Sequence, residues 1–188
     1  MIVLVVDALS ILFLVVVLLW IIVPVLYGLP PIPTKPERIR KALKLANLQP
    51  NEVLYDLGAG DGRVLLMAAR EFDAKAVGIE AGPIQCAWIW LRVAASGFGD
   101  RIQVRWANFY KAGLGEAEVV FIYATSKEVV KLAPHLEQQL KQGARVVSIS
   151  ADFPEWEPSA LDEHALIFLY EMPPTKGSIT SYMLKKAK

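Results

Sequence analysis

A glycine-rich turn at residues 53–63 constrains the fold of this chain more than any other stretch. The sequence VLYDLGAGDGR starts as a short apolar strand and reaches the acid Asp56, and glycine then occupies every second position, at Gly58, Gly60 and Gly62. Helical spacing of apolar residues resumes directly afterwards. A strand, a tight turn and a helix N-terminus in this order form the point where an α/β sheet lets a ligand approach the backbone. Glycine suits this turn because it adopts positive φ and has no Cβ to block the ligand.

The glycine spacing also distinguishes between ligand classes. Dinucleotide-binding turns read G-x-G-x-x-G and aim backbone amides at a pyrophosphate. Here the turn reads D-x-G-x-G-x-G, and the carboxylate of Asp61 lies inside it, where it would repel a pyrophosphate. The carboxylate of Asp56, at the carboxyl end of the strand, suits a cationic ligand instead. This spacing therefore opposes a nucleotide-dependent oxidoreductase.

The pattern D-L-G-A-G-D-G resembles motif I of the class I S-adenosylmethionine (SAM) methyltransferases, whose cofactor carries a sulfonium and an ammonium group. The resemblance implies that SAM binds at this turn. The cofactor-binding residues that it implies here are Asp56, Gly58, Ala59, Gly60 and Gly62.

Strand and helix patterns alternate after the turn, as in a parallel sheet. We expect strands at 76–80, 102–106, 119–123 and 144–149, and helices at 83–95 and 127–141. Residues 165–170 and 179–184 then read as two strands without a helix between them. The predicted fold class is α/β: a Rossmann-like class I methyltransferase with a seven-stranded, mostly parallel sheet and a carboxy-terminal antiparallel hairpin.

Three further residues follow strands at the edge where such a cofactor would bind. Glu80 ends the second strand, where an acid accepts hydrogen bonds from the ribose hydroxyls of an adenosine. Asn108 follows the third strand, where class I enzymes often place an acid for the adenine amino group, and Phe109 would flank the ring. The alternatives are a solvated strand-end carboxylate at Glu80 and an ordinary turn residue at Asn108.

The amino-terminal stretch predicts a membrane anchor. Residues 8–27 contain no charge, and at ~1.5 Å rise per residue a helix of that length spans the ~30 Å hydrocarbon core. The preceding residues include Asp7 and no Lys or Arg, unlike a signal peptide. We therefore expect one transmembrane helix before the domain, in contact with the bilayer through residues 8–27. The predicted organisation is an anchor at 1–28, a proline-rich linker at 29–36 and a methyltransferase domain at 37–188.

Flanking charge predicts the orientation of this anchor. Only the α-amino group precedes the apolar run, whereas five basic residues follow it, namely Lys35, Arg38, Arg40, Lys41 and Lys44. Because positive charge is retained on the cytoplasmic side, we expect a single-pass protein with its amino terminus outside and its catalytic domain in the cytoplasm.

Composition excludes two classes of partner. The net charge of +1 gives no strongly basic face for nucleic acid. One cysteine, Cys86, and two histidines far apart in sequence, His135 and His164, offer no cluster of metal ligands. We therefore expect neither a nucleic-acid partner nor a metal.

Additional motifs narrow the resemblance. They are P-I-P-T at 31–34, A-V-G-I-E at 76–80, P-H-L-E at 134–137, G-A-R-V-V-S at 143–148 and F-P-E-W at 153–156. Together they are similar to the membrane-anchored lysine methyltransferases of the ATP synthase c subunit and the adenine nucleotide translocase, and to their prokaryotic relatives. The resemblance implies SAM-dependent methyl transfer to a lysine amine of a membrane-associated protein. Asn108 departs from the group, which commonly carries Asp at that position.

The same resemblance suggests residues on the acceptor side. Tyr123 and Thr125, at the end of the fourth strand, would orient the amine, although both types also serve as packing or capping residues. Phe153 and Trp156 would form an aromatic wall for the lysine through cation–π contact, or else cover the sheet edge. Thr34, in the P-x-P-T segment, is a further residue expected on the substrate side.

Two other functions fit the same residues. One is methylation of a lipid or quinone headgroup, and the other is a membrane-tethered SAM-binding module without turnover. The chain has almost no insertion between its predicted core elements, so it lacks a lid to enclose a small substrate. This favours a macromolecular acceptor.

Overall fold

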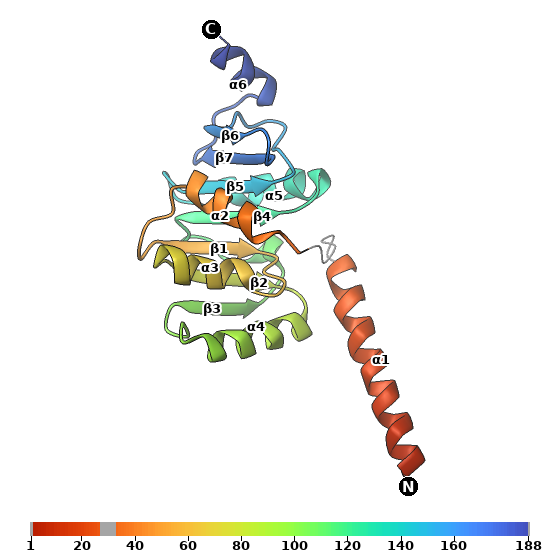
Figure 1. The fold of residues 1–188 in the computed structure, drawn as a ribbon. Coiled ribbons are helices and arrows are strands. Elements are labelled where there is room, and N and C mark those ends of the chain that lie inside the picture. Colours follow the sequence, from red (N-terminus) through yellow and green to blue (C-terminus); the bar gives the residue numbers. More distant parts are fainter. Residues whose placement is uncertain (1, 27–32, 188) are drawn as a thin grey trace.

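A seven-stranded sheet forms the centre of the computed structural model, which describes residues 2–26 and 33–187 (Figure 1). The strand order is β3-β2-β1-β4-β5-β7-β6. The strands are β1 Val53–Leu57, β2 Lys75–Glu80, β3 Ile102–Trp106, β4 Val119–Tyr123, β5 Arg145–Ile149, β6 Ala160–Asp162 and β7 Ile167–Glu171. β1 to β5 are parallel, and β7 pairs antiparallel with both β5 and β6. The predicted mixed sheet with an antiparallel carboxy-terminal hairpin is confirmed.

Helices cover both faces of this sheet. The helices of the described residues are α1 Ile2–Leu26, α2 Pro36–Leu45, α3 Arg63–Phe72, α4 Pro83–Ser96, α5 Ser126–Gln139 and α6 Ile179–Lys186, with a short 3-10 helix at Phe109–Lys111. Of these, α2 to α5 cover the sheet. α2, α3 and α4 bury residues such as Leu65 and Ile89 in the core on one face. α5 buries Leu132 and Leu136 in the core on the other. The carboxyl ends of the five parallel strands therefore lie together at one edge, between two helical layers.

The predicted last strand, 179–184, is wrong: these residues belong to α6. Ser178 precedes the helix and its Oγ accepts a hydrogen bond from the Ser181 N–H at 3.3 Å. In return the Ser181 Oγ accepts one from the Ser178 N–H at 2.8 Å. This capping box satisfies amides that the first turn leaves open, and it starts a helix where the short apolar run alone suggested a strand. β6, which precedes β7 in sequence, completes the hairpin instead.

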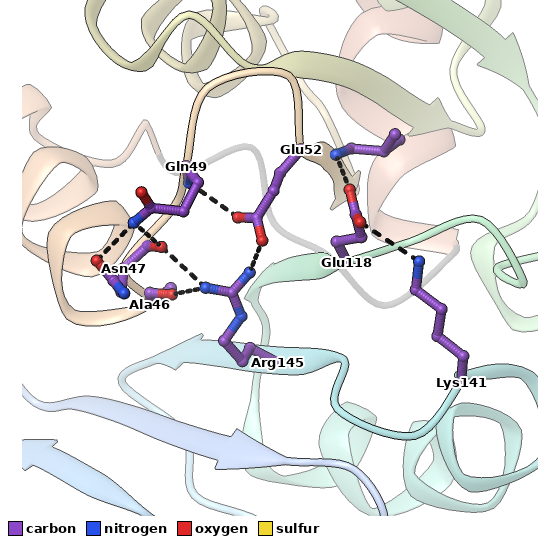
Figure 2. A network of polar contacts seen from close by, with 8 residues as sticks. Ala46, Asn47, Gln49, Glu52, Glu118, Lys141 and Arg145 are labelled. Atoms are coloured by element: carbon purple, nitrogen blue, oxygen red, sulfur yellow. Dashed lines mark hydrogen bonds and ion pairs between the residues drawn. The ribbon is translucent and has the colours of Figure 1, made fainter.

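A polar network ties together the amino-terminal ends of the strands, opposite the glycine turn (Figure 2). Arg145, the first residue of β5, donates to the Ala46 and Asn47 carbonyls at 2.7 and 2.8 Å and pairs with Glu52. Glu118 accepts from the Val53 N–H at 2.8 Å and lies 3.5 Å from the Lys141 Nζ. Each carboxylate here thus has a cationic partner, and the network fixes α2 against the starts of β1, β4 and β5.

α1 is a helix of 25 residues that contacts the domain at α4. The Gln85 Nε2 donates to the Trp20 carbonyl at 2.8 Å, and side chains such as Phe13 are exposed. Among residues 2–26 and 33–187, no helix reaches the combination of length and apolarity that crossing a membrane requires. The first half of the predicted linker, 29–32, and the last residue of the predicted span, 27, lie outside the described residues.

Candidate cofactor and acceptor site

The glycine turn adopts the backbone that its sequence predicts. Gly58, Gly60 and Gly62 have φ of 89°, 57° and 74°, a region that other residues rarely adopt. At Gly62 a Cβ would lie 2.8 Å from the Ile89 Cγ2, so glycine here lets the turn pack on α4. At Gly60 the nearest heavy atom to a Cβ would be the Gly58 carbonyl oxygen at 3.9 Å. Gly60 therefore presents an open backbone face that a ligand can approach.

The two acids predicted to bind the cofactor lie on one face of the sheet, beside this turn. Asp56 on β1 and Glu80 on β2 are 3% and 6% exposed. The Glu80 carboxylate accepts from the Gly60 and Gly82 N–H groups, each at 2.8 Å, which joins the turn to the start of α4. Burial raises the pKa of Glu80 despite these hydrogen bonds.

Asp56 differs from Glu80, because its carboxylate has no hydrogen-bond donor among the residues that the structure describes. Burial first, and then the negative charges of Glu80 and Asp61, raise the pKa of Asp56 to about 8. A cation bound beside it would favour the ionised form and lower that pKa. The pair of acids therefore fits a ligand that carries positive charge, as the sulfonium and ammonium groups of SAM do.

Asp61 is engaged in ion pairs that the sequence did not reveal. Its carboxylate lies 2.8 Å from the Arg63 Nη2 and 3.1 Å from the Arg92 Nη1. These contacts outweigh burial and hold the pKa of Asp61 below its usual value. Arg63 also donates to the Thr34 carbonyl at 2.8 Å, so Thr34, predicted as a substrate residue, is buried beside the glycine turn.

Asn108 and Phe109, the predicted adenine contacts, have local structural partners. The Asn108 Oδ1 accepts from the Tyr110 N–H at 2.9 Å and caps the 3-10 helix. Phe109 is buried in the core on the α5 face and its ring lies 4.4 Å from that of Tyr110. The turn-residue alternative thus describes Asn108 in this structure, and a contact with adenine stays a prediction.

Two residues at this edge were missed by sequence reasoning. Trp106, beside Glu80 in the register of β2 and β3, is 66% exposed and donates from Nε1 to the Ala81 carbonyl at 2.8 Å. Gln85 is buried over Gly82, and its Oε1 has no hydrogen-bond partner among the described residues. An orphaned buried acceptor and an exposed ring at the end of β2 and β3 both fit a nucleoside. The sequence does not reveal that Trp106 is exposed, because exposure depends on how the strands assemble into the sheet.

The predicted acceptor residues follow β4, next to β1 in the sheet. Tyr123 ends the strand half-buried, and Thr125 is the exposed N-cap residue of α5 without a side-chain capping bond. The Arg38 guanidinium lies 6.0 Å from the centroid of the Tyr123 ring. Arg38 is held by hydrogen bonds to the Ser150 Oγ at 3.0 Å and the Ala165 carbonyl at 2.6 Å. The tyrosine and threonine thus share one edge with the glycine turn.

Phe153 and Trp156 do not face this edge as an open wall. Each is 1% exposed, and their rings stack at 4.1 Å with Tyr170 packed edge-on at 5.2 and 5.5 Å. The Trp156 indole N–H donates to Glu137 at 2.8 Å. The two aromatics form part of the core beneath α5, which is the covering role given above as the alternative to a lysine-binding wall.

Three other features of the described residues do not add to this site: the possible metal ligands, the thiol of Cys86 and a hollow beside α6. Within the described ranges, no three His, Cys, Asp or Glu residues cluster as metal ligands. Cys86 is buried, and burial raises the pKa of its thiol to about 11, which leaves it unreactive. A hollow of about 590 Å³ lies between β7 and α6, lined by residues such as Met172 and Tyr182, away from the glycine turn.

Comparison with known proteins agrees with this geometry. A family model described as the ANTKMT methyltransferase domain matches residues 56–160, more than half of the chain. The chain belongs to this methyltransferase family. It is a SAM-dependent methyltransferase. Binding of the cofactor by Asp56, Gly60 and Glu80 stays a prediction.

Named relatives of this methyltransferase include lysine-modifying enzymes. It is 33% identical over 130 residues to a protein-lysine N-methyltransferase of Saccharolobus islandicus (strain REY15A), covering 69% of this chain and 81% of the relative. It is 25% identical over 151 residues to the Mus musculus lysine N-methyltransferase of the ATP synthase c subunit, covering 79% of this chain and 60% of the relative. The methyltransferase thus spans less than two thirds of the mouse protein's length.

Solved structures support the same fold. A structure described as an RNA methyltransferase from Salinibacter ruber, in complex with S-adenosyl-L-homocysteine, matches with a TM-score of 0.74 and 32% identity. The match covers 78% of this chain and 97% of that one. A SAM-dependent methyltransferase from Geobacter sulfurreducens matches with a TM-score of 0.55 and 22% identity, over 71% of this chain and 53% of that one, which supports the fold alone.

Proposed function

We propose that this methyltransferase transfers a methyl group from SAM to the side-chain amine of a lysine in a protein acceptor at a membrane. The observation that carries the proposal is its 33% identity, across most of both chains, with a protein-lysine N-methyltransferase. The mouse relatives named for the ATP synthase c subunit and the adenine nucleotide translocase act on lysines of proteins as well.

Among the described residues, the connection after β4 leaves the strand edge without a lid, and this supports a macromolecular acceptor. Only Ala124 and Thr125 separate β4 from α5, so this connection contributes no lid over the edge. Tyr123 and Thr125 remain accessible there. A small substrate would need closure to exclude water from the reaction, whereas a protein surface can itself cover the edge. The uncovered edge therefore favours a lysine presented on a protein.

Residues around Tyr123 assist the amine in the proposed reaction. SAM, when bound, supplies an electrophilic methyl group on a sulfonium. The lysine must be neutral to react, and deprotonating it at pH 7 costs about 4.6 kcal/mol at an unperturbed pKa of ~10.4. The Arg38 guanidinium over the Tyr123 ring disfavours a second cation nearby and so lowers the pKa of an approaching lysine. The Tyr123 and Thr125 hydroxyls orient the amine, a contribution that acts through alignment.

The membrane location is the second part of the proposal and rests on the sequence. The uncharged run at 8–27 anchors the chain, with the amino terminus outside and the domain in the cytoplasm beside the basic residues of α2. An acceptor in the same membrane would meet the enzyme at raised effective concentration. Resistance of the full-length protein to alkaline carbonate extraction tests the anchor, and complete release into the wash would overturn it.

Transfer of label from radioactive SAM tests the acceptor class. Full-length protein, in detergent or native membranes, is incubated with host membranes, and the protein, lipid and RNA fractions are counted separately. We expect label in protein, at lysine by mass spectrometry, and none with the Gly60→Val variant. Label confined to lipid or quinone would replace the lysine assignment, and label confined to RNA would favour the activity named for the Salinibacter relative. Cofactor binding without label in any fraction would indicate a binding module.

A further inference from the structure

The outward side of α4 is apolar throughout. We define the α4 outer face as the six exposed residues Ala87, Trp88, Trp90, Leu91, Ala94 and Ala95. Leu91 is the most exposed of the larger members, at 61%, and the two tryptophans lie on either flank of it. The opposite side of α4 packs Ile89 and Val93 into the core. An α-helix that is apolar on both sides is ordinarily covered on both.

Charge is also missing from this face. Arg92 is the one charged residue of α4, and its guanidinium turns aside to Asp61, at 3.1 Å. α5, which has the same length, exposes Lys127, Lys131 and Glu137 around its own outward Val130. Both helices cover the same sheet, so the difference does not come from their position in the fold. Removing the α4 outer face from water would cost no desolvation of a charged group.

α1 lies against the beginning of this same helix. The Gln85 Nε2 to Trp20 carbonyl hydrogen bond, at 2.8 Å, joins the two helices near the carboxyl end of α1. From this contact α1 extends beyond α4 and away from the sheet (Figure 1). Its side chains there, Phe13 and Leu14 among them, are as exposed as the α4 outer face. The two helices that touch at Gln85 thus both expose apolar side chains, and Trp88, Trp90 and Leu91 stay uncovered.

We propose that the α4 outer face lies in the headgroup region of the lipid bilayer that α1 enters, an inference that rests on the proposed membrane anchor. Tryptophan prefers this interfacial region, and an uncharged helix face with tryptophan and leucine binds there parallel to the surface. Lipid is favoured over a second copy of the chain because α1 already carries the apolar surface from α4 toward the membrane. With α4 on the bilayer, the Glu80–Gly82 segment that starts this helix holds the cofactor edge close to the lipid surface.

Depth-dependent quenching in vesicles tests this contact. Full-length Trp90→Cys, Phe13→Cys and Val130→Cys variants carry an environment-sensitive fluorophore, and Cys86 stays buried and unlabelled. Trp90 and Val130 are a matched pair, each 53% exposed. Vesicles of phosphatidylcholine and phosphatidylglycerol contain doxyl-labelled lipid as the quencher. We expect a blue shift and loss of emission at positions 13 and 90, and neither at position 130.

The outcomes separate the contact from the anchor. Quenching at 13 with position 90 as bright as 130 would overturn the α4 contact and leave the anchor standing. A blue shift at 90 without quenching would report protein cover, by a second copy or by α1 of the same chain, and would also overturn it. Quenching at 90 without quenching at 13 would overturn the proposal together with the anchor, because α4 would then bind lipid without insertion of α1. A triple Trp88→Ser, Trp90→Ser, Leu91→Ser variant should bind the same vesicles less well than Val130→Ser.

Discussion

The acids at the two edges of the sheet have opposite electrostatic surroundings. At the amino-terminal edge, Arg145 and Lys141 offset the charges of Glu52 and Glu118 (Figure 2). Burial alone would raise the pKa of Glu52, but hydrogen bonds from Arg145 and the Gln49 N–H, together with the positive charges of Arg145 and Lys141, lower it. At the carboxyl edge, Asp56 has no cationic partner among the described residues, and burial raises its pKa to about 8. The first edge is electrostatically complete, and the second becomes complete when a cation binds.

The amino-terminal edge should therefore contribute mainly to stability, and the carboxyl edge mainly to ligand binding. Breaking the partly buried Arg145–Glu52 pair leaves one charge without compensation, so the amino-terminal network should matter chiefly for folding. The carboxyl edge keeps a strained turn and a buried acid that do not improve the stability of the free protein. Such features are expected where a ligand supplies the missing interactions.

Glycine substitutions should give the largest difference in SAM affinity between the two edges. Gly60→Val at φ 57° should weaken SAM binding at least about 100-fold, because a branched side chain fills the open face of the turn. Gly143→Val, before β5 at φ 81° and with no atom within 4 Å of a Cβ, imposes similar backbone strain at the other edge. Calorimetric titration with SAM should show normal affinity for folded Gly143→Val. Equal loss in both variants would mean that strain, and not the site, governs binding.

Much of the fold followed from local signals in the sequence. β3 and β4 have their predicted bounds. β4 is a short apolar run, β3 alternates apolar and polar residues, and each is followed by a helical or capped segment. α6 was missed since 179–184 is too short for periodicity to distinguish helix from strand, and its cap is a Ser-x-x-Ser box without the usual Glu or Gln.

The site was predictable where the chain itself brings the groups together. Asp56 and the glycines are neighbours in sequence, and Glu80 ends the next strand, so a parallel sheet places them at one edge. The partners of Asp61 and the exposure of Trp106 depend on how α4 and β3 pack, which no local pattern encodes. The burial of Phe153 and Trp156 likewise follows from Tyr170 on a distant strand.

Removing the guanidinium at the amino-terminal edge should give the next largest effect, on stability. Arg145→Met leaves Glu52 without its partner and two carbonyls without a donor, and should lower the free energy of unfolding by about 2–3 kcal/mol. Arg40→Met removes the more exposed pair with Glu71 and should lower the free energy of unfolding by much less than Arg145→Met does. Urea unfolding measures both. SAM affinity should stay unchanged in each, and a weakened affinity in Arg145→Met would link the two edges.

Neutralising Asp56 should affect the two properties in opposite directions. The raised pKa of Asp56 stabilises the free protein at low pH, and this stabilisation is lost as pH rises from about 4 toward about 8. Asp56→Asn should remove this fall in the free energy of unfolding, so the variant should be more stable than the wild type above about pH 8. SAM affinity at pH 8 should drop about 10-fold, since the anionic partner of the cation is gone.

Measurements of SAM affinity at several pH values show whether the charge of Asp56, and not only its shape, contributes to binding. In the wild type SAM affinity should rise with pH up to about 8, because the cation favours ionised Asp56 and binding releases a proton. Asp56→Asn should flatten that dependence. Its persistence in the variant would assign the titration to another group, with Glu80, whose pKa burial also raises, as the next candidate.

The smallest effect is expected on the acceptor side of the carboxyl edge. Tyr123→Phe keeps the ring under Arg38 and removes only the hydroxyl, so kcat should fall about 3- to 10-fold, the loss of one hydrogen bond of about 1 kcal/mol. SAM affinity should not change, because Asp56 and the glycine turn remain intact. Single-turnover rates with the lysine acceptor measure this, and Tyr110→Phe, beyond β3, serves as the control. Weakened SAM binding in Tyr123→Phe would place its hydroxyl on the cofactor and leave the amine to be oriented by Thr125.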